Sequence, residues 1–166
     1  MSSRNKNDMK KNPVSENVQL RLEHFLPYRL SILTNKISAS IADTYRGKFG
    51  LSITEWRIMA VLGEYPKISA DEVSIKTQIE KSILSRAIAK LLLRKLIERE
   101  FSKTDRRRSI LTLTASGMSV YEEVVPLALQ YESQLLKCFS GSEYEQFSKL
   151  LERLFQHVGK DSAQIL

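Results

Sequence analysis

Residues 102–114 read SKTDRRRSILTLT and place three consecutive arginines directly after an aspartate. Neighbouring guanidinium groups repel one another in water, so a loop that only joins two elements gains nothing from them. Beside a polyanion the cluster is stabilised, and the minor groove of DNA attracts an inserted guanidinium. Asp105 can accept a hydrogen bond from a neighbouring arginine, which would shape the loop and aim one arginine outward. The stretch therefore indicates contact with a nucleic acid.

The positive charge of the chain is concentrated around this stretch. The formal net charge is +7, from 26 lysines and arginines against 19 acidic residues. Residues 76–108 hold eleven of the basic and four of the acidic residues, so this segment alone carries +7 and the rest of the chain is neutral. A charge run by itself is usually a solvated face, but a surplus confined to one segment favours a polyanionic partner there.

The composition argues against several other functions. The chain has one cysteine and two histidines, too few for a disulfide framework or a Cys- or His-based zinc site, so we expect no metal and no cofactor. No catalytic constellation occurs at usable spacing, which argues against an enzyme. No apolar stretch approaches the roughly 20 residues that span a bilayer, and residues 1–19 lack the apolar core of a secretory signal. We expect a cytoplasmic protein without a membrane partner, and an inert, half-buried thiol at Cys138 rather than a redox sensor.

Helical patterns precede the basic segment. Over residues 25–46, apolar side chains at spacings of three and four predict a helix with one stripe facing a partner, namely Leu26, Leu30, Leu33, Ile37 and Ile41. Ser52 and Glu55 have the S-x-x-E spacing of a capping box and predict the start of a second helix. Ser69 and Glu72 repeat this spacing before a short helix over about 70–76.

The next helix is predicted to have two different faces. Leu84, Ile88 and Leu91, with Leu92 at the edge, recur at helical spacing and are expected to face the core. The opposite face is small and basic and carries Lys81, Ser82, Ser85, Arg86, Ala89 and Lys90. Such a face suits a helix that enters the major groove, because serines allow close approach and Arg86 can pair bidentately with guanine.

Two strand patterns follow, IEREF at 97–101 and SILTLT at 109–114, so the charged residues 103–108 are predicted to form the tip of a hairpin. Arg99 alternates with apolar strand residues, which fits a structural ion pair at least as well as contact with DNA. A long helix is then expected from the cap residue Thr114 to about Phe139, with a kink at Pro126. A last helix is expected from Ser140 or Ser142 to about Val158.

This order of elements is that of a winged helix-turn-helix. Four stretches resemble the MarR family of bacterial transcription regulators: LSITEWRIMAVL, SADEV, KSILSRAIAKLLLRKLIERE and KTDRRRSILTLTASG. The last is similar to the family's wing signature, D-x-R, a spacer, L-T and a nearby glycine, matched by Asp105, Arg107, Leu113, Thr114 and Gly117. The resemblance covers residues 25–158 and implies an obligate homodimer that binds pseudo-palindromic double-stranded DNA.

The resemblance also implies roles for single residues. Arg107 takes the place of the arginine that enters the minor groove, and Asp105 that of its positioning partner. With the outward face of the basic helix, the predicted DNA-binding residues are Lys81, Ser82, Ser85, Arg86, Lys90, Asp105, Arg106, Arg107 and Arg108. One departure is visible: the family has glycine before the LI that ends the recognition helix, and this chain has Lys95. Either Lys95 is left-handed, at a cost of about 1 kcal/mol, or the helix ends differently.

A small effector, often an aromatic acid, is a further implication of the resemblance. It would bind between the dimer helices and the DNA-binding lobe, where apolar walls and a cationic or hydroxyl group would hold its carboxylate. The candidate effector-binding residues are His24, Tyr28, Arg29, Ser38, Trp56 and Arg57. Each of these side chains, taken alone, is more often plain packing or surface.

We therefore expect a mainly α fold with a small β-hairpin wing, a winged helix-turn-helix with N- and C-terminal dimerisation helices. The expected organisation is a flexible basic tail at 1–20, an N-terminal dimerisation helix at 21–50, the DNA-binding lobe at 51–114, C-terminal dimerisation helices at 115–158 and a tail at 159–166. The expected function is a regulator, a repressor released by an aromatic acid; the alternative is a constitutive architectural DNA-binding protein without an effector.

Overall fold

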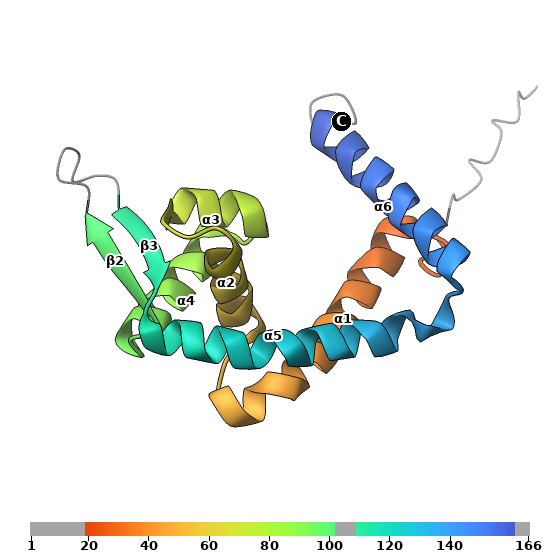
Figure 1. Ribbon diagram of the computed structural model, residues 1–166. Coiled ribbons are helices and arrows are strands. Elements are labelled where there is room, and N and C mark those ends of the chain that lie inside the picture. The colour runs from red at the N-terminus through yellow and green to blue at the C-terminus, as the bar shows by residue number, and fades with distance from the viewer. Residues whose placement is uncertain (1–18, 102–108, 162–166) are drawn as a thin grey trace, which may run out of the picture. The chain divides into compact units, whose positions relative to one another are not determined.

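The computed structural model describes residues 19–101 and 109–161. The chain divides between Lys36 and Ile37 into two compact units. The elements, in chain order (Figure 1), are α1 Leu26–Phe49, α2 Ile53–Glu64, β1 Ile68–Ser69, α3 Ala70–Thr77, α4 Lys81–Leu93, β2 Ile97–Phe101, β3 Ser109–Leu113, α5 Ala115–Leu135, the 3-10 turn η1 Leu136–Cys138 and α6 Gly141–Asp161. The expected fold class, mainly α with a small antiparallel sheet, is confirmed.

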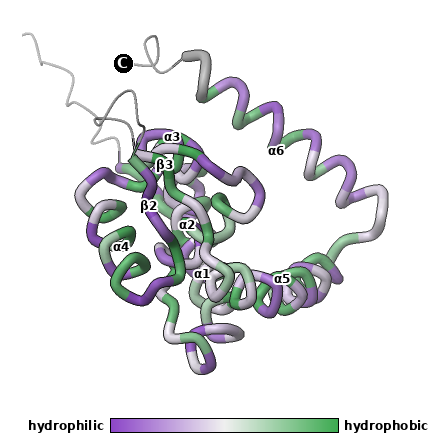
Figure 2. The backbone as a smooth tube through the Cα atoms, turned by 60° about the vertical axis from the view of Figure 1, so that its left-hand side comes forward, coloured by the Kyte–Doolittle hydropathy of each residue, from purple (hydrophilic) through white to green (hydrophobic). Residues whose placement is uncertain are grey.

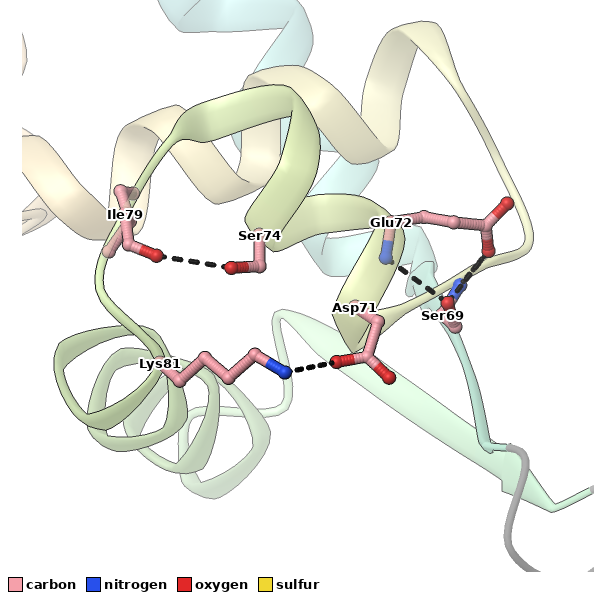
Figure 3. A network of polar contacts seen from close by, with 6 residues as sticks. All are labelled: Ser69, Asp71, Glu72, Ser74, Ile79 and Lys81. Carbon is pink, nitrogen blue, oxygen red and sulfur yellow. Dashed lines mark hydrogen bonds and ion pairs between the residues drawn. The ribbon is translucent and has the colours of Figure 1, made fainter. Parts of the chain in front are cut away.

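Serine–glutamate capping boxes start the helices where the sequence predicted them. The Ser52 amide donates to the Glu55 carboxylate at 2.7 Å, and the Glu55 amide donates to the Ser52 hydroxyl oxygen at 3.2 Å. Ser69 and Glu72 repeat this pair with the same distances (Figure 3). At α6 the amide that donates to the Glu143 carboxylate belongs to Ser140, which decides between the two predicted start residues. These bonds satisfy amides that the first helical turn leaves without partners.

The predicted hairpin is present, and a third strand joins it. β2 and β3 are antiparallel with Ile97 opposite Leu113 and Phe101 opposite Ser109. β1 adds to the other side of β3, with Ile68 opposite Leu111, which gives the order β1-β3-β2. β1 was not predicted, because a strand of two residues is too short to show alternation.

The core lies where α2, α3 and α4 meet the sheet. The predicted inward residues Leu84, Ile88 and Leu91 are buried, whereas Leu92 is half-buried. They pack in one cluster with side chains of the neighbouring elements, among them Ile58, Met59, Leu62, Val73, Ile97 and Leu111. Burial of this inward face forces the opposite face of α4 toward solvent.

Gly117, in the first turn of α5, lies against the backbone that follows α4. A Cβ atom at this position would be 1.8 Å from the Leu96 carbonyl oxygen. The Leu96 carbonyl also accepts a hydrogen bond from the Thr114 amide at 3.1 Å, so it has little freedom to move. The glycine of the wing signature is thus explained by the close approach of α5 to this carbonyl group.

Two long helices expose much of their apolar surface. In the N-terminal unit, Leu26, Leu30 and Leu33 of the predicted α1 stripe are exposed, and in the other unit Ile37 and Ile41 are half-buried. Along α6, hydrophobic and hydrophilic residues alternate around the helix (Figure 2). Its exposed apolar side chains are Tyr144, Phe147, Leu150, Leu151, Phe155 and Val158. Among the described residues, no helix is both long enough and apolar enough to cross a membrane.

Cys138 is exposed, so the expectation of a half-buried thiol is wrong. It is the last residue of η1, and its thiol donates to the Leu135 carbonyl oxygen at 3.4 Å. The predicted long helix ends earlier than expected, at Leu135, and the 3-10 turn replaces its final residues.

Replacement of Gly117 by alanine is expected to destabilise the fold. The new methyl group would overlap the Leu96 carbonyl oxygen, and separating them must shift α5 or the end of α4, at a cost of about 2 kcal/mol or more. Gly47→Ala is the control, because Gly47 is inside α1 with open space around it and should gain up to about 1 kcal/mol. Urea denaturation of both variants measures the difference; equal stabilities would contradict the packing role of Gly117.

Candidate nucleic-acid interface

A compact turn between α3 and α4 sets the direction of α4. Gln78 ends α3 in the left-handed conformation, at φ +53°. Within the turn, the Ser74 hydroxyl donates to the Ile79 carbonyl oxygen at 3.1 Å (Figure 3). The Thr77 hydroxyl donates to the Val73 carbonyl oxygen at 2.7 Å. These bonds fix the backbone, so α4 leaves the turn at a defined angle.

The outward face of α4 has the composition that the sequence predicted. Lys81, Ser82, Ser85, Arg86 and Lys90 are all exposed. The residues between them on the inward face are buried, so the exposed set forms one face of the helix. The face is therefore accessible to a nucleic acid. Contact of each of these residues with DNA stays a prediction.

Hydrogen bonds orient the first turn of this face. Glu80 is the N-cap of α4, and its carboxylate accepts from the Ser82 amide at 3.1 Å and from the Ser82 hydroxyl at 2.6 Å. These bonds hold the pKa of Glu80 below its usual value. Arg86 donates through Nε to the Ser82 carbonyl oxygen at 3.3 Å. Because that bond uses only Nε, the two terminal nitrogens of Arg86 keep the geometry needed for a bidentate partner.

Lys81 and Arg99 lie at a crevice between α3, α4 and β2. The crevice has a volume of about 190 Å³ and is lined by Ala70, Asp71, Ser74, Lys81, Leu84, Ser85, Ile88 and Arg99. Lys81 pairs with Asp71 at 3.3 Å (Figure 3), and both side chains are about 80% exposed, so the pair contributes little to stability. Within residues 19–101 and 109–161 Arg99 has no ion pair. The sequence did not indicate that Asp71 would lie beside Lys81.

The end of α4 decides between the two alternatives for Lys95. Lys95 is left-handed, at φ +57°, in the position that favours glycine. The Leu96 amide donates to the Leu91 carbonyl oxygen and the Lys95 amide to the Leu92 carbonyl oxygen, both at 3.0 Å, which is a Schellman motif. The adjacent Arg94 donates to the Phe49 and Gly50 carbonyl oxygens at 2.5 and 3.2 Å. Arg94 therefore ties α4 to the end of α1 and does not project toward a partner.

The hairpin is anchored at the same junction. The Thr114 hydroxyl donates to the Lys95 carbonyl oxygen at 2.7 Å and accepts from the Gly117 amide at 3.0 Å. One threonine thus joins the end of α4 to the start of α5 at the base of the hairpin. Four predicted wing residues, Asp105, Arg106, Arg107 and Arg108, lie outside the described residues.

Comparison with known proteins identifies this arrangement. The model of the MarR family matches residues 49–108. A crystal structure of a MarR/EmrR family transcriptional regulator from Acinetobacter sp. ADP1 is 30% identical, with a TM-score of 0.77, over 85% of this chain and 99% of that chain. This chain belongs to the MarR family. MarR proteins are DNA-binding transcriptional regulators with a winged helix, so the relatives are regulators and not enzymes.

Two further MarR relatives are informative. The HTH-type transcriptional regulator BilQ of Clostridium symbiosum is 28% identical over 107 residues, which are 64% of this chain and 74% of BilQ. A structure of Bordetella bronchiseptica BpsR, described as showing regulation of its DNA binding by 6-hydroxynicotinic acid, has a TM-score of 0.72. It covers 82% of this chain and 96% of BpsR at 22% identity, so the match itself shows the fold alone.

The predicted effector-binding residues of this MarR chain fall into both units. His24, Tyr28 and Arg29 are exposed residues of the N-terminal unit. In the other unit, Arg57 donates to the Ser38 hydroxyl oxygen at 3.0 Å, so the structure brings these two together. Trp56 is buried, and its ring lies 5.6 Å from that of Tyr45 and 6.0 Å from that of Tyr121, measured between centroids.

Two features near these residues were not predicted. Tyr45 is fully buried, and its hydroxyl is the buried side-chain polar atom that lacks a hydrogen-bond partner in the described part of the chain. Burial raises the pKa of Tyr45, against the opposing effect of Arg46 and Arg57. A separate groove of about 530 Å³ is lined by Arg46, Gly50, Leu51, Ser52, Glu55, Lys90, Leu93 and Arg94, and none of the six predicted effector-binding residues lines it.

Replacement of Lys95 by glycine is expected to stabilise the protein by about 1 kcal/mol, because it removes the Cβ that makes a left-handed residue costly. Lys95→Ala is the matched control, since alanine removes the charge and keeps the Cβ. Thermal and urea unfolding of both variants measure the effect. An equal gain in the two variants would assign it to charge and not to backbone strain.

Proposed function

We propose that the protein is a homodimeric, sequence-specific transcriptional repressor that a small aromatic acid releases from its operator. The observation that carries the proposal is the exposed, basic face of α4, held between a fixed turn and the base of a hairpin. The charge surplus of +7 lies wholly in residues 76–108, the segment that contains this face and the arginines after β2. A protein that neutralises phosphates needs this clustering of charge.

The two parts of the segment would contact DNA differently. α4 would enter the major groove, with Arg86 pairing with guanine and Ser82 and Ser85 near base edges or phosphates. Arg107 would enter the neighbouring minor groove with Asp105 as its brace. Lys81, Lys90, Arg106 and Arg108 would contact phosphates, which position the protein without reading sequence.

The exposed apolar side of α6 supports a homodimer. Tyr144, Phe147, Leu151, Leu154 and Val158 recur at spacings of three and four, the pattern of a helix that packs along another helix. Most of these side chains are exposed, as are the leucines at the start of α1. An exposed apolar area of this kind indicates a protein partner. A second copy would place two α4 helices about 34–36 Å apart, which fits a pseudo-palindromic operator.

The region around Ser38 and Arg57 supports an effector that carries a carboxylate. Arg57 and Ser38 offer a guanidinium and a hydroxyl group for the carboxylate. The ring of the neighbouring Trp56 packs with the rings of Tyr45 and Tyr121, and such aromatic side chains are typical of the walls of a ligand pocket. The buried Tyr45 hydroxyl is a further polar group, and within the described residues it has no hydrogen-bond partner. Regulation of the DNA binding of BpsR by an aromatic acid supports the same class of ligand. His24, Tyr28 and Arg29 belong to the N-terminal unit, and their contact with the effector stays a prediction from the sequence.

An architectural protein without an effector is the second candidate, favoured by the same concentration of charge in residues 76–108. It would bind DNA with strong salt dependence and little sequence preference. Competition between promoter DNA and random DNA of equal length separates the two functions. Equal competition would favour the architectural protein.

Arg86→Ala is expected to weaken binding to the protein's own promoter DNA by about 1–3 kcal/mol and to leave binding to random DNA nearly unchanged, since a base contact is lost. Arg107→Ala should weaken binding and lower the salt dependence by about one unit of slope. Fluorescence anisotropy across a salt series measures both, and sedimentation should find two protomers on each operator.

Lys149→Ala is the control for this experiment, because it removes one positive charge from α6 and should leave operator affinity unchanged. Unchanged affinity of Arg107→Ala would overturn the wing assignment. Unchanged discrimination by Arg86→Ala would overturn its role in base readout.

Aromatic carboxylic acids are expected to raise the melting temperature of the protein, since a ligand that binds the folded state stabilises it by mass action. The shift should be largely lost in Arg57→Ala, which removes the proposed cationic partner, and kept in Arg153→Ala on α6. A thermal-shift screen measures this, and a hit should reduce operator affinity. A panel of acids without any shift would count against the effector.

A further inference from the structure

An exposed carboxylate stands at the tip of the recognition helix. Glu80 immediately precedes α4 and caps it, and both of its oxygens accept hydrogen bonds from Ser82, at 3.1 and 2.6 Å. The residue itself is exposed, so the bonds hold the carboxylate in one orientation on the outer surface of the lobe. Two of the predicted DNA-binding residues, Lys81 and Ser82, are its neighbours.

A cap alone does not account for this choice of residue. Serine, threonine, aspartate and asparagine are the preferred N-caps, and α2, α3 and α5 are capped by Ser52, Ser69 and Thr114. A carboxylate on a surface that approaches phosphates is repelled by them, which weakens binding to DNA of every sequence. Glu80 therefore costs affinity unless it meets a hydrogen-bond donor on the DNA.

The edges of the bases in the major groove narrow the choice of donor. Cytosine presents its N4 amino group, and glutamate is a known type of acceptor for it. Adenine also presents an amino group, but its N7 acceptor lies alongside and would repel a carboxylate. The hydrogen-bonding groups that guanine and thymine present in the major groove are acceptors. A carboxylate oxygen beside them would have no proton to accept and would be repelled. Each oxygen of Glu80 retains a lone pair after its bond to Ser82.

The hydrogen bonds from Ser82 prepare the Glu80 carboxylate to accept a hydrogen bond from a base. The two bonds favour the charged form and hold the pKa of Glu80 below its usual value, so at neutral pH the group is an acceptor only. Arg86 is close enough to favour the charged form as well. Since the N-terminal residues of a recognition helix contact base edges, Glu80, which directly precedes α4, would lie at the end of the helix that enters the groove.

We propose that Glu80 is a specificity-determining residue that accepts a hydrogen bond from the N4 amino group of one cytosine in each half-site, with Ser82 as its positioning residue. The proposal rests on the proposed function, because it requires α4 to enter the major groove. It adds a preference for cytosine to a helix whose Arg86 is proposed to pair with guanine. It also makes the tip of α4 discriminate against sequences that lack the cytosine.

Selection from duplexes of randomised sequence, with the full-length protein, tests the proposal. The wild-type protein is expected to select a motif with one cytosine at symmetric positions in the two half-sites. Glu80→Ser keeps a preferred N-cap and removes the carboxylate, so preference for that cytosine should fall by about 5- to 150-fold, with the other positions retained. Glu80→Gln should shift the preference toward adenine, because an amide can pair bidentately with adenine.

Ser82 variants test the positioning role separately. Ser82→Ala should reduce the preference for cytosine at the same position without a change in the salt dependence of binding. Ser82→Thr keeps the hydroxyl and should restore the preference. A loss of helix stability alone would weaken binding to all sequences equally. Melting temperatures identify any variant that folds poorly. If a Ser82 variant folds poorly, Glu80→Gln supplies the comparison.

The outcomes separate this proposal from the proposed function. If the wild-type protein selects no motif, sequence-specific regulation fails, and the reading by Glu80 fails with it. If the wild-type protein selects a motif but Glu80→Ser and Glu80→Gln select the same one, only the role of Glu80 is overturned. A wild-type motif without a cytosine at symmetric positions would also overturn the role of Glu80 alone.

Discussion

The backbone at Lys95 and Leu96 is the point on which the geometry of the DNA-binding lobe depends. The Schellman motif ends α4 there, and the two carbonyl groups accept the hydroxyl and the amide of Thr114. α5 can begin at this point only because Gly117 leaves room for the Leu96 carbonyl oxygen. The helix, the hairpin and α5 are therefore fixed to one short segment of main chain. A shift of this segment would move α4 and the hairpin together.

The strain at Lys95 has a physical explanation in this setting. A left-handed residue with a Cβ costs about 1 kcal/mol, and the motif is retained because two backbone bonds and the Thr114 hydroxyl bond depend on it. Arg94 adds two bonds to the carbonyl oxygens that end α1. The surrounding hydrogen bonds over-determine the conformation, so the unfavourable residue is tolerated.

The sequence predicted what depends on local pattern and missed what depends on tertiary proximity. The capping boxes at Ser52 and Ser69, the inward face of α4 and the hairpin all follow from spacing along the chain, and the structure has them. β1 was missed because its two residues form a strand only through pairing with β3. Cys138 is exposed and lies in a 3-10 turn that no residue pattern indicated.

The same distinction applies to the candidate site. The exposed face of α4 could be predicted, since helical spacing alone separates it from the core. The neighbours of that face could not: Asp71 approaches Lys81 from another helix, and Arg99 approaches from a strand. The sequence places Glu80 two residues before Ser82, but only the geometry shows that one serine donates to both carboxylate oxygens.

The interface thus combines a rigid backbone with side chains that can exchange partners. Main-chain bonds, caps and buried leucines set the position of α4, and their loss would cost folding free energy. The Lys81–Asp71 pair, in contrast, is about 80% exposed on both sides, and such a pair contributes about 0–1 kcal/mol. Lys81 can therefore leave Asp71 for a phosphate with little loss. In the proposed function, this division would allow α4 to bind DNA without deformation of the lobe. The spacing between the lobes of two protomers would then be the variable through which an effector acts.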